Sequence, residues 1–131
     1  SITDQKSITH PADENAYNGV GSNAEIRFNP NENPSLITQN ETSKQVQQER
    51  RPAYIGLAHE LIHGMHINAG VAKRKSVTVT PTIQRNGQKY TYIKPIPLED
   101  AITVGLHGFL TNGPTENSIR KEHNLNVRLL Y

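Results

Sequence analysis

The chain has 131 residues, 34% of them hydrophobic, and its 14 Lys and Arg residues against 12 Asp and Glu residues give a net charge of +2. A chain of this length can bury one hydrophobic core, so we expect residues 1–131 to form a single domain. The small net charge argues against a nucleic-acid partner, and the lack of a long apolar stretch argues against a membrane partner. There is no cysteine, which excludes disulfides and thiolate metal ligands.

The first fifty residues are mostly polar. Residues 1–22 suggest an irregular lead-in, and the start at Ser1 without a signal-peptide pattern suggests a domain excised from a longer protein. Residues 24–29 alternate like a half-buried strand that stops at Pro30. Residues 30–51 predict a long polar connection, with Asn-Pro pairs at 29–30 and 33–34.

A helix is predicted from about Pro52 to about Asn68. Proline suits a first helical position, and Gly70 is a natural helix end. The segment between them is apolar on most sides, which favours a central, buried helix.

This helix carries the string His59-Glu60-Leu61-Ile62-His63. Two histidines four residues apart lie one turn apart on the same helix face, so both imidazoles can reach one zinc ion. The intervening Glu60 then faces a bound water as a general base. The string therefore predicts a zinc hydrolase, with His59 and His63 as metal ligands and Glu60 as the catalytic residue.

The second half of the chain contains both strand and helix signals. The runs 76–82 and 88–94 are rich in β-prone residues and flank Asn86-Gly87, which predicts a hairpin. A short helix is predicted to begin near Leu98 in the segment 97–110, and Thr115 is placed to cap a last helix over 116–123. The fold class is therefore α+β.

A catalytic zinc ion needs a third protein ligand. A His six residues after His63 would extend the motif, but that position is Ala69. His66 shares the helix face, yet one straight helix cannot easily aim three imidazoles at one tetrahedral ion, so packing or support of a ligand is the better role for it. Acidic residues on the later helices remain, with Glu99 the first choice, Glu116 the second and Asp100 the third.

Three blocks of the sequence resemble the motif blocks of the NleD-type effector zinc metalloproteases. They are residues 57–63 (LAHELIH), 99–106 (EDAITVGL) and 115–122 (TENSIRKE), and the resemblance covers roughly residues 24–131. It implies that His59 and His63 are ligands, that Glu60 is the general base, and that an acidic residue of the second block, Glu99 or Asp100, is the third ligand.

The resemblance also implies a biological setting. The family consists of secreted bacterial effectors and polymorphic-toxin domains that type III or type VI secretion delivers into a target cell, where they cleave proteins. We accordingly expect a monomeric, compact, zincin-like domain with a central motif helix, a small antiparallel sheet or hairpin, and a second helix carrying the third ligand. Its cofactor would be Zn²⁺, and its partners a target-cell protein substrate and a cognate immunity protein.

Some alternatives stay open at this point. A zinc hydrolase of cell-wall peptides and a non-catalytic, zinc-stabilised binding module would share the motif. The donor that stabilises the reaction's oxyanion is one of four candidates: Tyr92, His107, Arg120 and Tyr131. The strand at 24–29 offers an edge on which an extended substrate can pair.

Overall fold

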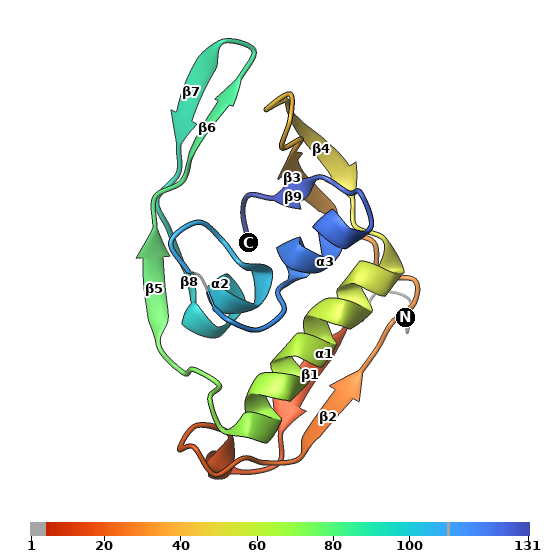
Figure 1. The fold of residues 1–131 in the computed structure, drawn as a ribbon, viewed down its shortest axis with the longest axis vertical. Coiled ribbons are helices and arrows are strands. Elements are labelled where there is room, and N and C mark those ends of the chain that lie inside the picture. The colour runs from red at the N-terminus through yellow and green to blue at the C-terminus, as the bar shows by residue number, and fades with distance from the viewer. Residues whose placement is uncertain (1–4, 110) are drawn as a thin grey trace.

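The computed structural model describes residues 5–109 and 111–131 and has an α+β fold, as predicted. The elements, in chain order, are β1 (Ile8–Pro11), a 3-10 helix (Glu14–Ala16), β2 (Ala24–Arg27), β3 (Ser35–Gln39), β4 (Val46–Arg50), α1 (Ala53–Ala69), β5 (Ser76–Val79), β6 (Thr82–Arg85), β7 (Gln88–Thr91), β8 (Lys94–Pro97), α2 (Leu98–Val104), α3 (Glu116–Glu122) and β9 (Val127–Arg128). The long helix α1 runs through the molecule, with the β1–β2 hairpin on one side and α2 and α3 on the other (Figure 1).

Helix α1 confirms the predicted motif helix. It begins after Pro52 and ends at Gly70, whose φ of 75° is left-handed and lets its amide reach the carbonyls of His66 and Ile67. A side chain at Gly70 would also meet backbone, because a Cβ there would lie 2.7 Å from Gly21 N. Glycine is therefore required both by the backbone angle and by the close approach of the preceding loop.

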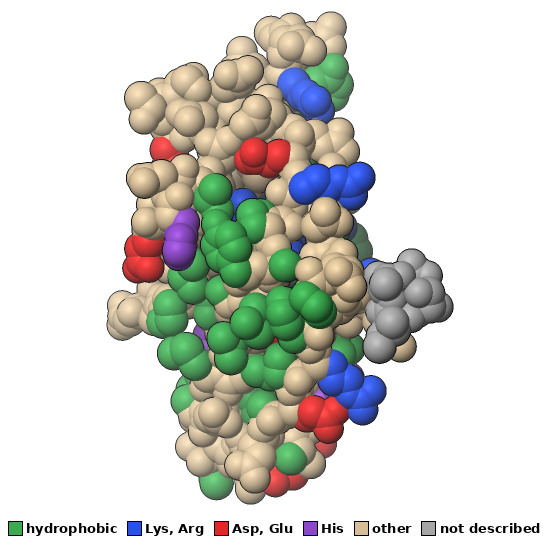
Figure 2. Space-filling view, turned by 90° about the vertical axis from the view of Figure 1, so that its right-hand side faces the viewer, with side chains coloured by type: hydrophobic (Ala, Val, Ile, Leu, Met, Phe, Trp, Pro, Cys, Tyr) green, Lys and Arg blue, Asp and Glu red, His purple; other side chains and the backbone are tan. Residues whose placement is uncertain are grey.

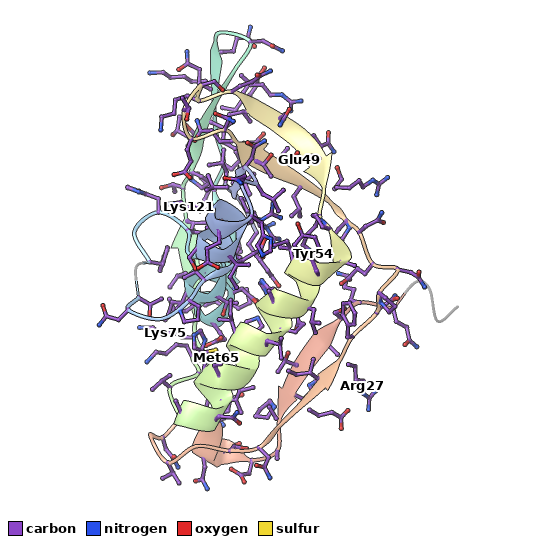
Figure 3. The ribbon with its side chains drawn as sticks, turned by 45° about the vertical axis from the view of Figure 1, so that its right-hand side comes forward. Arg27, Glu49, Tyr54, Met65, Lys75 and Lys121 are labelled. Carbon is purple, nitrogen blue, oxygen red and sulfur yellow. The ribbon has the colours of Figure 1, made fainter. Side chains whose placement is uncertain are left out.

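The expectation of a central, buried helix is met only in part. Ile55, Ile62 and Ile67 are buried, but Leu61 and Met65 are about half exposed. Figure 3 labels Tyr54 and Met65 near the two ends of the helix, and Figure 2 shows hydrophobic side chains gathered in the middle of the face that it views. The helix carries apolar residues on most sides, yet in the described chain it has partners on only part of its circumference.

The first half of the chain contains more strands than predicted. β1 lies within the expected irregular lead-in and pairs antiparallel with β2, and β3 and β4 form within the expected polar connection. β3 is also paired with β9, which gives a three-stranded sheet in the order β4-β3-β9. The sequence pattern that would predict β4 is weak, because this strand is Val-Gln-Gln-Glu-Arg, which is polar and has no apolar alternation.

The predicted hairpin is confirmed. β6 and β7 pair with Arg85 opposite Gln88, and both turn residues, Asn86 and Gly87, have positive φ, as a two-residue hairpin turn requires. The flanking β5 and β8 form a second antiparallel pair, with Pro81 between β5 and β6. Together the two pairs form an arm that projects from the helices (Figure 1).

The two short helices that follow the arm were also predicted. α2 begins at Leu98 and ends at Val104, and Leu110, the last residue of the predicted segment, lies outside the described residues, as do residues 1–4. Thr115 caps α3 in a capping box with Ser118. None of the helices in the described chain combines the length and hydrophobicity needed to cross a membrane.

Candidate active site

The two motif histidines face each other from successive turns of α1. Their Nε2 atoms lie 3.0 Å apart, and their rings meet edge to face with centroids 4.7 Å apart. The side chain of His59 is 3% exposed. Two Nε2–H groups cannot point at each other at this distance, so at least one of these atoms presents a lone pair.

Asp100 completes a triangle with these two nitrogens. Its Oδ1 lies 2.9 Å from Nε2 of His63 and 3.6 Å from Nε2 of His59. The residue belongs to the first turn of α2, which packs against α1. Three donor atoms from two helices therefore converge on one point.

The outer nitrogen of each motif histidine donates to a different carboxylate. Nδ1 of His63 lies 2.6 Å from Oε2 of Glu99, and Nδ1 of His59 lies 2.8 Å from Oε1 of Glu116. Such bonds fix the ring orientation and leave Nε2 free to bind a metal. Glu99 and Glu116, which the sequence analysis ranked first and second as the third ligand, thus bind the Nδ1 atoms of the two rings.

Glu99 is itself fixed by several donors. Its Oε2 accepts from Thr103 Oγ1 at 2.9 Å and from Nδ1 of His66 at 2.8 Å, and its Oε1 accepts from the amide of Lys73 at 3.2 Å. His66 therefore lies against Glu99, at the outer nitrogen of His63. A cluster of His63, His66 and Glu99 results, which shares His63 with the triangle of donors but lies at its other ring nitrogen.

Glu116 lies at the centre of a buried ionic network. Its Oε2 accepts from Nε of Arg120 and its Oε1 from Nη1 of Arg128, both at 2.9 Å. Glu116 is fully buried and Arg120 nearly so, and Nη2 of Arg120 has no hydrogen-bond partner in the described structure. Such a network carries a large desolvation cost that good geometry has to offset.

Glu60 faces an open cleft beside the histidines. Its Oε1 accepts a hydrogen bond of 2.8 Å from Thr9 Oγ1. The same Thr9 hydroxyl lies 3.1 Å from the backbone oxygen of Glu60. The cleft has a volume of about 360 Å³ and is walled on one side by Ile8, Thr9 and Pro11 of β1. The strand beside the site is therefore β1, not the predicted one at 24–29, which pairs along the outside of β1.

Tyr131 covers the cleft from the end of the chain. Its ring stacks on that of His59 with centroids 6.1 Å apart and an interplanar angle of 12°, and its hydroxyl lies near Asp100. Burial raises the pKa of this phenol, and the neighbouring Asp100 carboxylate raises it further. The hydroxyl therefore stays protonated and able to donate.

The other candidate oxyanion donors lie in different settings. Tyr92 and His107 are exposed, and neither lines the cleft. Arg120 is bonded to Glu116. Of the four candidates, Tyr131 is the one that lines the cleft.

The titrating groups of the site are tightly coupled. Burial by itself would lower the pKa of His63, but hydrogen bonds to Asp100 and Glu99 outweigh it and raise the pKa to about 9. Burial would raise the pKa of Glu99, but His63 and His66 lower it to about 2. The pKa of Asp100 is lowered in the same way by the two motif histidines. Without a metal, the carboxylates around the site thus favour the protonated form of His63.

The donor set suits a zinc ion. With zinc–ligand bonds of about 2.0 to 2.1 Å, neighbouring ligands of a tetrahedral ion lie roughly 3.4 Å apart. The separations between His59 Nε2, His63 Nε2 and Asp100 Oδ1 are 3.0, 2.9 and 3.6 Å, which bracket this value. The ligand atoms of His59, Glu60 and His63 also lie within 4.8 Å of one another. Two imidazoles and a carboxylate are a ligand set that leaves a fourth position open.

Comparison with protein families decides the classification. A family model described as an effector protein, Peptidase M91, matches residues 2–131. The chain belongs to the M91 peptidase family. This confirms the resemblance to NleD-type effectors and makes the chain a protease of the effector class. Comparisons with curated proteins and with solved structures give no significant match.

Two supporting residues had not been found from the sequence. Thr9 lies 51 positions before Glu60 in a segment without a motif, so only long-range packing reveals its contact. Thr103 lies one turn after Glu99 on α2, and its hydroxyl becomes informative only once Glu99 is seen to face His63.

The buried network around Glu116 generates a stability prediction. Glu116→Gln removes the negative charge between two buried guanidinium groups, so we expect the metal-free protein to lose about 3–5 kcal/mol of unfolding free energy at pH 7, measured by urea denaturation. The control Glu122→Gln changes an exposed residue of the same helix and should lie within about 0.5 kcal/mol of wild type.

The same pair of proteins tests the pH dependence. Burial opposes ionisation of Glu116, but His59 and the two arginines lower its pKa from the ordinary 4.5 to about 2. A lowered pKa stabilises the fold above pH 4.5, and that contribution disappears as the pH falls toward 2. The stability difference between wild type and Glu116→Gln should therefore narrow over this window. A difference independent of pH would contradict the assignment.

Proposed function

We propose that the chain is a zinc-dependent metalloendopeptidase whose metal ligands are His59, His63 and Asp100. The observation that carries the proposal is the convergence of two Nε2 atoms and one carboxylate oxygen beside an open cleft lined by Glu60. Membership of a peptidase family of effectors supports the same reaction. When bound, zinc acts as a Lewis acid that polarises a peptide carbonyl and activates water.

Asp100 is the better third ligand than Glu99 for a geometric reason. Asp100 faces the two Nε2 atoms, whereas Glu99 accepts from Nδ1 on the opposite side of the His63 ring. One imidazole cannot present both nitrogens to the same ion. In this proposal Glu99 and Glu116 are positioning residues that orient His63 and His59.

Glu60 is the general base in the proposed mechanism. Its carboxylate takes a proton from the attacking water and passes it to the leaving amine as the peptide bond breaks. The hydrogen bond from Thr9 holds the carboxylate at the cleft. A hydroxyl bonded to one carboxylate oxygen leaves the other oxygen available for the proton.

Tyr131 is the proposed oxyanion donor. Its hydroxyl is protonated, lies next to Asp100, and is held by the stacking of its ring on His59. A donor preorganised in a partly buried site stabilises the charge that develops on the carbonyl oxygen.

The cleft favours an extended stretch of a protein substrate. Within the described residues β1 pairs with β2 alone, so its other edge can accept main-chain hydrogen bonds from a peptide. Effector membership supports delivery into a target cell and a protein substrate there. We place the reaction on proteins of that cell.

The role of Glu60 as the general base can be tested by substitution. Glu60→Gln should keep its zinc, because no ligand is removed, but lose cleavage by several orders of magnitude. Cleavage is measured as new termini in a cell lysate, and zinc by elemental analysis, with the exposed Glu25→Gln as control. Full activity in Glu60→Gln would overturn the mechanism.

The second prediction separates the two acidic neighbours. Asp100→Ala should weaken zinc binding by more than about 100-fold, whereas Glu99→Ala, which removes a positioning residue, should weaken it by about 10–100-fold. Competition with a chromophoric chelator measures both affinities. The reverse order would make Glu99 the ligand, as the sequence first suggested.

The third prediction concerns Tyr131. Tyr131→Phe keeps the ring on His59 and removes only the hydroxyl, so kcat should fall by about 100- to 1,000-fold with KM and zinc content little changed. Tyr92→Phe, on the exposed arm, is the matched control. Equal activities of the two variants would exclude Tyr131 as the donor.

A further inference from the structure

We propose that a second cavity, which shares Tyr131 with the catalytic cleft, is the subsite for a large apolar side chain next to the scissile bond. This inference rests on the peptidase function proposed above and adds a sequence preference to it. The cavity has a volume of about 310 Å³. That is at the small end of the roughly 300–1,000 Å³ range of ligand pockets, which suits one side chain.

The cavity is lined mainly by apolar side chains from three separate segments: the end of β5, the residues after α2, and the tail after β9. Its apolar lining residues are Val79, Pro81, Leu106, Phe109, Leu129 and Leu130. Figure 1 shows the end of the chain lying between α3 and the β5–β8 pair. A site assembled from three segments keeps its shape only when the whole domain is folded.

The charge of the cavity indicates which side chains it accepts. Lys94 is the one charged residue among the described lining residues, and its ammonium donates to the backbone oxygen of Tyr131. The described lining contains no Asp or Glu side chain that could pair with an incoming cation. We therefore expect leucine, methionine or phenylalanine to be accepted, and lysine or arginine to be rejected.

Tyr131 connects this cavity to the site of reaction. Its ring stacks on His59 and also packs against the buried cluster that includes Leu106, together with Val79 and Phe109. Residues of an extended peptide are spaced about 3.4 Å apart. A substrate whose carbonyl lies at the two histidines therefore has a side chain within one or two residues of Tyr131 and the cavity.

The experiment has a cleavage arm that uses a peptide mixture made by digesting a bacterial proteome. Wild type should enrich large apolar residues at one position beside the cut. Val79→Phe fills the cavity and should reduce cleavage of these peptides by about tenfold or more relative to peptides with alanine there. Val79→Ala enlarges the cavity and should shift the preference toward aromatic residues.

Val77→Ala is the matched control. Val77 lies on the same strand and packs against the same hydrophobic cluster, but it does not line the cavity. Its cleavage profile should equal that of wild type. An unchanged profile in both Val79 variants, or a profile without apolar preference, would overturn the proposal.

A binding arm is independent of catalysis. N-acetyl-phenylalanine amide, titrated into metal-free protein, should shift the methyl NMR signals of Leu129 and Leu130 in wild type and in Val77→Ala, but not in Val79→Phe. Binding without any cleavage by wild type would refute the peptidase function and leave the cavity as an apolar binding site. Cleavage without these shifts and without apolar preference would refute the cavity alone.

Discussion

The hydrogen bonds from Nδ1 of the two motif histidines to carboxylates of two other helices organise this structure. His63 donates to Glu99 of α2 and His59 to Glu116 of α3, so both short helices are tied to α1 at its most buried polar point. Each bond also fixes the tautomer of the ring and turns Nε2 toward its partner. The same two hydrogen bonds thus hold the three helices together and orient the Nε2 atoms that we propose as metal ligands.

This arrangement depends on charge compensation inside the protein. Burying Glu116 is unfavourable unless its charge is matched, and Arg120 and Arg128 provide that match within 2.9 Å. Glu99 is balanced by hydrogen bonds from His66 and Thr103. Carboxylates still outnumber guanidinium groups around the two histidines. The local excess of negative charge favours a bound cation at the point where the Nε2 atoms meet.

In the proposed function, the cleft and the apolar cavity divide substrate recognition between them. The cleft is bounded by β1 and by polar groups of the motif helix, and the cavity by apolar residues of the arm, the segment after α2 and the tail. Tyr131 lines both. Under this proposal its hydroxyl contributes to the rate of cleavage and its ring to the sequence preference.

Short-range patterns in the sequence were enough to predict several elements of the fold. The motif helix, the Asn86-Gly87 hairpin and the Thr115 cap follow from helix periodicity, turn chemistry and capping, which act within a few residues. The pairing of His59 with His63 follows from the helix repeat alone. The strands β3 and β4 were missed, because β4 is polar and β3 is held by pairing with β4 and with the distant β9.

Which acidic residue faces which side of each imidazole depends on how the helices pack, and no short-range pattern specifies that. Glu99 and Asp100 are adjacent in sequence and both lie in the first turn of α2, yet a helix turns by about 100° per residue, so they point in different directions. The orientation of α2 against α1 aims Asp100 at the Nε2 atoms and Glu99 at Nδ1 of His63. Thr9 and Tyr131 reach the site from opposite ends of the chain, and long-range packing alone brings them there.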